Sequence, residues 1–189
     1  RGLGDVYKRQ VLGLLSSSYK QLKVTEVAAG DVSSVLGNSH VSSVSVSDSA
    51  SAIGSNLAAL IQAGTKLTAI TETGTVSNVN LTAGQYSTAL TGKFSNFSAT
   101  VSGVGAGATG TYANDKHVAS LSISDTATNV AKNLDTLQGL GAKVSAISLT
   151  DGGTPVLNLT GAQLSKDASA LSLITSPYQV ALSGAVTAA

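Results

Sequence analysis

The sequence predicts an α+β protein of small tandem domains, each a β-α-β-β-α-β unit with its helices packed on one face of an antiparallel sheet. Three observations predict this class. A nine-residue stretch occurs twice. In each copy, a run in which apolar and polar residues alternate is followed by apolar residues at helical spacing, and a Gly-rich turn separates two further strand-like runs. Both copies carry the same succession of patterns, so we expect the same fold in each.

The repeated stretch is HVSSVSVSD at 40–48 and HVASLSISD at 117–125. Further matches follow in the same order, including NLTAGQ with NLTGAQ and the Ser-Gly pairs that end at Gly103 and Gly184. Self-similarity sustained over a whole segment is typical of repeat proteins. The predicted organisation begins with the end of a preceding repeat and a short linker helix at 11–39. A first repeat at 40–103, a Gly-rich linker at 104–116 and a second repeat at 117–184 follow, and another linker starts at 185–189.

The first elements of each repeat are a strand and a helix. Within 117–125, small polar residues alternate with apolar ones, which is typical of a half-buried strand. Asp125 then stands where a helix N-cap belongs, and Asp48 holds the same place in the first copy. The helices that follow have apolar residues at three- and four-residue spacing: Ile53, Leu57 and Leu60 in one copy, Val130, Leu134 and Leu137 in the other.

The second half of each repeat reads as a hairpin, a helix and a strand. KVSAISLTD and PVLNLTG flank the turn residues DGGT, a pattern that favours two antiparallel strands. A weaker helical pattern covers 162–174, and YQVALSG from Tyr178 reads as the closing strand. The helix, TDG-turned hairpin and second helix resemble BON-type domains, so BON-like αββαβ units are the alternative fold.

Composition excludes several classes of protein. Only 11% of the 189 residues are charged, the formal net charge is +1 and the basic residues are scattered, so a nucleic-acid partner is not expected. The absence of Cys excludes disulfides and thiolate metal sites. The apolar run VLGLL at 11–15 is far too short to cross a membrane. The opening decapeptide, 1–10, resembles a translated sequencing-adapter artefact, and we treat it as a non-native tag.

Polar residues that attract a functional hypothesis have structural explanations. His40 and His117 precede the repeated strand in both copies, without a nucleophile or further ligands in pattern, so a structural role is expected. Asp151 in TDGGTP is the one acid of its loop, whereas calcium needs about six or seven oxygen ligands. The acid of the matching loop in the other copy, Glu72, stands at a different position, so we read both segments as turns and not as calcium sites.

Two further motifs carry no predicted activity. GAGATG at 105–110 satisfies G-x-G-x-x-G, but TYANDKHVASLSIS follows with no helix start, so it is read as a linker rather than a dinucleotide site. The glycosylation sequons at Asn80, Asn96 and Asn158 are expected by chance in a chain so rich in Ser and Thr. We therefore predict no catalytic, cofactor-binding or metal-binding residues, no cofactor and no enzymatic activity.

The wording SVSVSDSASAIGSNLAAL and SLSISDTATNVAKNLDTL, followed by ISLTDGGTPVLNLTGAQLSKDASAL, resembles the tandem repeats of very large bacterial surface or secreted proteins. Such proteins include adhesins, some of which end in RTX repeats. The resemblance implies a structural or spacer array outside the cell or on the bacterial surface, with neighbouring repeats as its partners. The alternative is a module that recognises a glycan or protein of a host or cell surface through its loops at 72–78 and 150–155.

Overall fold

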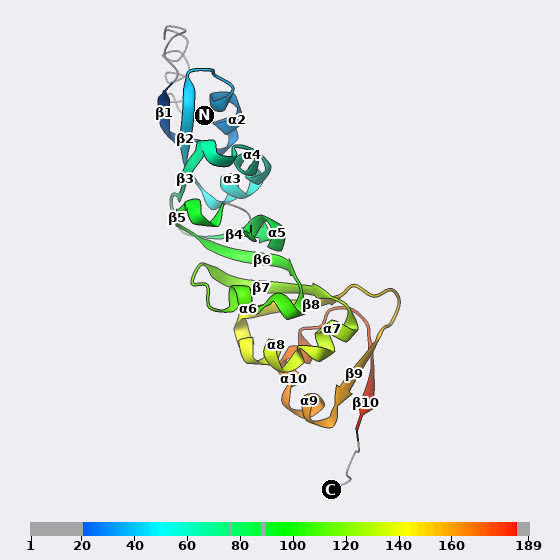
Figure 1. Cartoon of the computed structure of the whole chain (residues 1–189). Helices are drawn as coiled ribbons and strands as arrows, with labels where there is room; N and C mark the ends of the chain where they lie inside the picture. Colours follow the sequence, from blue (N-terminus) through cyan, green and yellow to red (C-terminus); the bar gives the residue numbers. More distant parts are fainter. Residues whose placement is uncertain (1–20, 76, 88–89, 185–189) are drawn as a thin grey trace. The chain divides into compact units, whose positions relative to one another are not determined.

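The computed structural model describes residues 21–75, 77–87 and 90–184, and it divides into two compact units, Arg1–Ser98 and Ala99–Ala189 (Figure 1). The tag at 1–10, the beginning of the preceding repeat end predicted at 11–39 and the segment 185–189 lie outside the described residues. Each unit combines short strands with short helices.

The N-terminal unit contains one four-stranded sheet with the order β1-β2-β3-β5, in which every pair is parallel. Its elements in chain order are β1 (Leu22–Val27), η1 (Ala29–Asp31), α2 (Val32–Leu36), β2 (Val41–Asp48), α3 (Ala50–Ser55), α4 (Leu57–Gln62), η2 (Gly64–Lys66), β3 (Leu67–Glu72), β4 (Asn78–Thr82), α5 (Ala83–Ser87), η3 (Thr91–Lys93) and β5 (Phe94–Asn96).

The C-terminal unit shows the same succession of elements from its first strand to the helix after β9, and differs beyond it. Strands β6, β7 and β8 pair in parallel, and β9 pairs in parallel with β10. The elements are β6 (Ser98–Val104), η4 (Ala106–Ala108), α6 (Gly110–Ala113), β7 (Val118–Asp125), α7 (Ala127–Lys132), α8 (Leu134–Leu140), η5 (Gly141–Lys143), β8 (Val144–Leu149), β9 (Val156–Thr160), α9 (Gly161–Lys166), α10 (Ala168–Ser172) and β10 (Gln179–Ser183).

The predicted fold class is wrong. The protein mixes helices with parallel sheets, so neither a string of β-α-β-β-α-β domains on antiparallel sheets nor BON-like αββαβ units describes it. Helices α3 and α4 connect β2 to β3, and a connection through a helix lets the second strand run in the same direction as the first. The predicted hairpin at DGGT is also wrong, because β8 pairs with β7 and β9 pairs with β10, so the two strands belong to different sheets.

The sequence repeat is visible as a repeated register. Leu22 lies opposite Val41 in the β1–β2 pair, and Ala99 lies opposite Val118 in the β6–β7 pair. Both ladders contain two irregularities at matching places. Strands β3 and β8 also share one pattern of buried and exposed residues, as do β4 and β9.

Each unit has its own buried apolar core, formed by one face of its sheet and the apolar faces of its helices. The predicted helix residues Ile53, Leu60, Val130 and Leu134 are fully buried. The largest other side chains with almost no exposure are Leu67, Ile70 and Leu81 in the N-terminal unit and Leu121, Ile123, Leu137, Ile147, Leu157 and Leu159 in the C-terminal unit. Burial of these alternating and helically spaced residues is the main favourable contribution to folding.

A bulge near the end of β1 and of β6 places one residue in the left-handed region. Gly103 adopts φ 69° in β6, and Glu26 adopts φ 56° at the matching place in β1. Glycine accepts this conformation without steric cost, whereas a side chain at Cβ crowds the backbone. The N-terminal unit therefore stores strain at Glu26 that the C-terminal unit avoids.

We expect Glu26→Gly to raise the free energy of unfolding by about 1 kcal/mol, because glycine relieves the left-handed strain. Gly103→Ala should lower it by about 1 kcal/mol or more for the converse reason. Urea unfolding of the full chain measures both changes. Glu26→Gln, which removes the charge and keeps the Cβ, is the control; an equal gain in this variant would assign the effect to charge.

Candidate functional site

The most highly connected polar groups are the strand-end aspartates, Asp48 and Asp125, which end β2 and β7. The Asp125 Oδ2 atom accepts a hydrogen bond from the backbone N–H of Ala106 at 2.9 Å, across 19 residues of sequence. Its Oδ1 atom accepts from the N–H of Thr126 at 2.8 Å and from the Asn129 amide at 2.7 Å. Each carboxylate oxygen therefore holds a different segment of the chain.

Asp48 makes the matching contacts in the N-terminal unit. Its Oδ2 accepts from the N–H of Ala29 at 3.0 Å, and its Oδ1 accepts from the N–H of Ser49 at 2.8 Å. The Asp48 carbonyl also accepts from Thr73 N–H, just as the Asp125 carbonyl accepts from Thr150 N–H. A strand-end aspartate thus joins the preceding turn, its own strand and the loop after the next strand.

The interpretation of these aspartates as N-caps is wrong. The N-cap residues are Ser49 and Thr126, whose side chains accept from the N–H groups of Ala52 and Asn129. The correct N-caps could have been predicted from the sequence, because Ser and Thr are preferred N-cap residues and each stands directly after the aspartate. With the cap position occupied, the carboxylate is available for a contact that is distant in sequence.

The GAGATG segment is part of this arrangement. Its residues form η4 and the start of α6, and the N–H of Ala106 points at the Asp125 carboxylate. Gly105 lies beside this carboxylate, but its counterpart in the N-terminal unit is Ala28, so the matching hydrogen bond there forms without a glycine. The amide that would face a phosphate in a dinucleotide site binds a carboxylate of the protein itself.

The electrostatic consequence is clearest at Asp125. Partial burial raises the pKa of its carboxyl group, but hydrogen bonds from the Asn129 side chain and from the Thr126 and Ala106 N–H groups outweigh burial, and the net pKa is lowered. The charged form is therefore stabilised by folding. This stabilisation is present above the pKa of the unfolded chain and is lost as the pH falls through the lower folded pKa.

Asp125→Asn should lower the free energy of unfolding at pH 7 by about 1–3 kcal/mol, because it removes charge-assisted hydrogen bonds to three donors. The difference from the parent chain should shrink as the pH falls below about 4, where the parent carboxylate becomes protonated. Urea unfolding at several pH values measures it. Thr126→Ala is the control, since loss of a cap costs about 1 kcal/mol at every pH; a pH-independent effect of Asp125→Asn would contradict the assignment.

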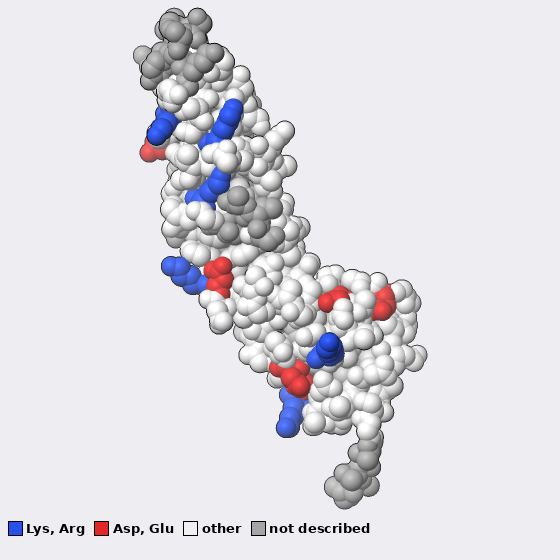
Figure 2. All heavy atoms as spheres, viewed as in Figure 1, with Lys and Arg blue, Asp and Glu red and all other residues white. Residues whose placement is uncertain are grey.

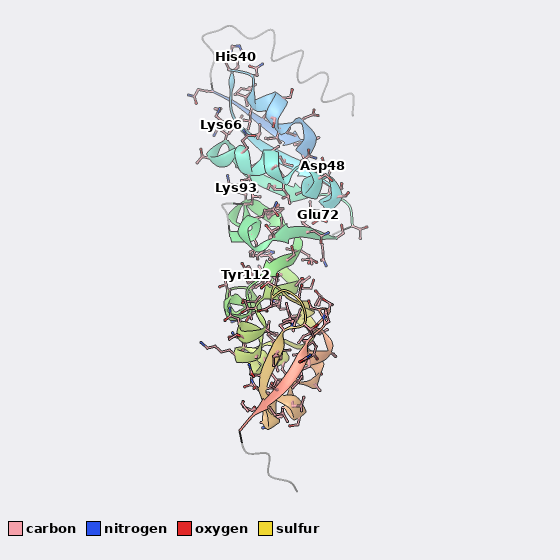
Figure 3. The ribbon with its side chains drawn as sticks, turned by 90° about the vertical axis from the view of Figure 1, so that its right-hand side faces the viewer. His40, Asp48, Lys66, Glu72, Lys93 and Tyr112 are labelled. Carbon is pink, nitrogen blue, oxygen red and sulfur yellow. The ribbon has the colours of Figure 1, made fainter. Side chains whose placement is uncertain are left out.

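The two histidines take part in strand initiation. The N–H of His40 donates to Asn38 Oδ1 at 3.0 Å, and its carbonyl accepts from the N–H of Leu22. His117 uses Asp115 Oδ1 and the N–H of Ala99 in the same way. Figure 3 shows that His40 lies at one end of the N-terminal unit and that Asp48 and Glu72 lie towards its other end.

Lys93 and Lys143 each end a 3-10 helix directly before a strand. The Lys143 Nζ donates to the carbonyls of Ala113, at 2.7 Å, and Asp115, at 3.1 Å. Lys93 Nζ donates to the carbonyls of Gly64 and Leu67. A cation is favourable at the carboxyl end of a helix, where unpaired carbonyls concentrate negative partial charge.

The loop acids considered as calcium ligands also bind backbone. Glu72 Oε1 accepts from the N–H of Ser77 at 2.7 Å and closes the loop between β3 and β4. Asp151 Oδ2 accepts from the N–H of Ala127 at the start of α7. Within the described residues, no group of three or more His, Asp or Glu side chains is placed to hold a metal ion.

A second carboxyl group was missed by sequence reasoning. Asp167, between α9 and α10, is only 3% exposed, and its Oδ2 atom is buried without a hydrogen-bond partner among the described residues. Burial raises the pKa of this carboxyl, and the Asp135 side chain raises it further by hydrogen bonding and by charge repulsion, against a smaller opposing effect of Lys166. The pair is absent from the N-terminal unit, where Ala58 stands in the place of Asp135.

Asp167→Asn should raise the free energy of unfolding at pH 7 by about 1 kcal/mol or more, because an amide can donate to Asp135 and carries no buried charge. The folded pKa of Asp167 is raised, so the parent chain is most stable below the unfolded pKa and loses stability as the pH rises through the folded value. The gain should therefore vanish near pH 4, as urea unfolding would show. Asp135→Asn should give a gain of the same sign; a loss in both variants would contradict this description.

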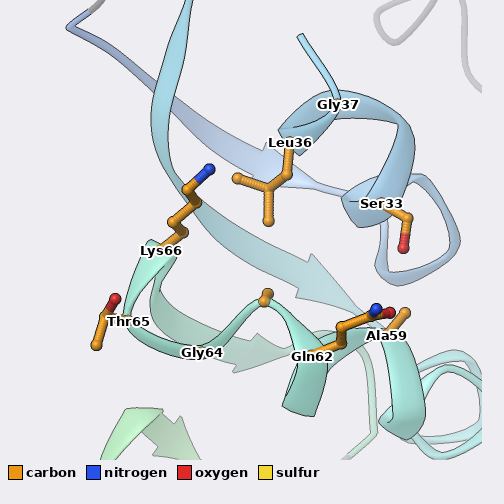
Figure 4. A pocket seen from close by; sticks show the side chains of 9 residues that line it. Ser33, Leu36, Gly37, Ala59, Gln62, Gly64, Thr65 and Lys66 are labelled. Carbon is orange, nitrogen blue, oxygen red and sulfur yellow. The ribbon is translucent and has the colours of Figure 1, made fainter. Parts of the chain in front are cut away.

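A surface hollow of about 510 Å³ lies between α2 and the α4–η2 segment, and Figure 4 shows the Lys66 amine directed towards Leu36. Helices α2 and α4 both end here, so their carbonyls oppose the binding of an anion beside Lys66. The hollow is lined by Ser33, Leu36, Gly37, Ala59, Gln62, Ala63, Gly64, Thr65 and Lys66. This lining favours no particular ligand.

The remaining observations assign no activity. Charged side chains are few and scattered on the face shown in Figure 2. No helix in the described part of the chain is long and apolar enough to cross a membrane. Comparison of the chain with protein-family models, curated proteins and solved structures finds no match.

Proposed function

We propose that this chain is a structural segment, a spacer array of a large exported bacterial protein of adhesin-like type, without catalysis. The observation that carries the proposal is the use of its polar residues. The strand-end aspartates, Lys93, Lys143 and Glu72 all bind the backbone of the chain itself. Groups committed in this way hold a fold together and are not free to act on a substrate.

Composition supports the same role. Charged residues make up only 11% of the chain, and Ser, Thr, Gly and Asn supply most of its polar surface. The two units use the same carboxylate contacts at corresponding places. Duplication of the repeat can therefore lengthen the chain while each added copy is held together by the same contacts. The exported location rests on the resemblance of the repeats to those of bacterial surface proteins.

A second candidate is a ligand-binding module, favoured by one hollow beside the loop at 72–78. It has a volume of about 420 Å³ and a lining of small and amide side chains: Ala50, Ser51, Gly54, Ser55, Ser77, Asn78 and Asn80. Amides and hydroxyls suit the hydroxyl groups of a glycan. The lining contains no aromatic ring on which a sugar could stack, so we rank this function second.

Single-molecule stretching of the full chain tests the structural role. We expect each compact unit to unfold in one step, with a gain in length of roughly 3.3–3.6 Å per residue released. Asp48→Asn should weaken the step of the N-terminal unit, and Asp125→Asn the step of the C-terminal unit, because each ties three segments together.

Extension without discrete steps would contradict the structural role.

The alternative function is tested by titrating a panel of soluble glycans against the chain. Saturable binding that Asn78→Ala abolishes, and that the control Asn129→Ala leaves intact, would favour the ligand-binding module instead.

A further inference from the structure

Among the described residues, strand β10 is paired with β9 along one edge and unpaired along the other. The N–H of Gln179 donates to the carbonyl of Pro155 at 2.9 Å, on the side where β9 lies. Successive amides in a strand point to opposite sides, so the N–H groups of Val180 and Leu182 face away from β9. Their side chains are 43% and 46% exposed, among the most exposed large apolar groups of the described residues.

The corresponding positions in β6 are completely covered. FSATVSGV in β6 matches YQVALSGAV from Tyr178, which aligns Ala99 with Val180 and Val101 with Leu182. Ala99 and Val101 are 0% exposed, and β6 pairs with β7 along this edge. The N–H of Ala99 donates to the His117 carbonyl at 2.7 Å.

Strand β1 is paired in the same way, since the N–H of Leu22 donates to the His40 carbonyl at 3.0 Å. A strand of the β2 and β7 type therefore covers this edge in both places where the chain supplies one. The edge of β10 carries the same pattern of residues, with no charged side chain to discourage pairing.

The residue that follows β10 already has the backbone conformation found at the bulges of β1 and β6. Gly184 adopts φ 98°, in line with φ 69° at Gly103 and φ 56° at Glu26. In β1 and β6 this residue lies where the ladder with the next strand is irregular. The conformation that accommodates the partner strand is thus present directly after β10 as well.

We propose that β10 is an acceptor edge for a strand with the sequence pattern of β7, supplied by a further repeat of the same protein. The incoming strand runs parallel to β10. By analogy with the pairs Ala99–Val118 and Val101–Leu121, its valine lies opposite Val180 and its leucine opposite Leu182. A histidine carbonyl of that repeat accepts from the N–H of Val180. This inference rests on the proposed structural role and names its partner.

The left-handed conformation of Gly184 distinguishes this occupant from an arbitrary apolar partner. A flat apolar surface would cover Val180 and Leu182 without using their N–H groups or the conformation of Gly184. A β7-type strand uses the edge amides, the apolar side chains and this glycine together. The repeat sequence contains this strand twice, at 40–48 and 117–125.

Hydrogen exchange measured by NMR tests the proposal on the full chain extended by one repeat. The extended chain ends its native part at Gly184 and continues with a copy of residues 104–149. We expect exchange at Val180 and Leu182 to slow by tenfold or more. Exchange at Gln179 and Ala181, which face β9, should change little and serves as the internal reference.

A matched control carries Val118→Ser, Leu121→Ser and Ile123→Ser in the added copy alone, so its length is unchanged but its strand cannot bury apolar side chains. The proposal predicts no slowing at Val180 and Leu182 in this control. It is overturned if the added copy gives no protection, or if the control protects equally. Protection in the unextended chain that grows with protein concentration would assign the edge to a second molecule and would also overturn it.

This test is separate from the stretching experiment. Mechanical steps of the two compact units without protection at β10 would leave the structural role standing and refute the partner. Protection at β10 in a chain that extends without discrete steps would confirm the pairing of repeats and refute the structural role.

Discussion

The carboxylate at the end of the second strand is the interaction on which each unit depends. Asp48 and Asp125 bind the 3-10 turn that follows the preceding strand and the N-cap residue of the helix that follows their own strand. Their carbonyls bind the loop after the next strand. Parallel strands need long connections, and these connections leave backbone amides that must find acceptors. One short acidic side chain supplies acceptors for several of them.

The same need for partners explains where the charges lie. Asp48 and Asp125 lie where a strand ends and a helix begins, and Lys66, Lys93 and Lys143 lie where a short helix ends and a strand begins. Figure 3 labels Asp48, Lys66 and Lys93 in the N-terminal unit. This arrangement follows the helix dipole, with anions at amino ends and cations at carboxyl ends. A chain with few charges thus uses several of them to complete its backbone hydrogen bonds, and its exposed surface is largely neutral.

Local periodicity predicted the elements well and their pairing poorly. The strand predicted at 117–125 is confirmed as β7, with Leu121 and Ile123 buried, but its start departs from strict alternation because Val118 is buried and Ala119 is exposed. The helical spacing is confirmed by the burial of Val130 and Leu134. The DGGT turn led to the wrong prediction of a hairpin, because a glycine-rich turn indicates only that the chain changes direction. Whether the next strand joins the same sheet depends on which edges are already occupied.

The sequence by itself determined the repeat, the positions of most strands and helices and the residues that form the apolar faces, because these features depend on neighbours within one or two turns of the chain. Only the tertiary structure decided the parallel pairing, the targets of Asp48 and Asp125, the contact of the buried Asp167 with the exposed Asp135 and the edge of β10 that the described residues leave unpaired. These depend on groups brought together across 19 or more residues, and no local pattern encodes which distant amide, carboxyl or strand will be the partner.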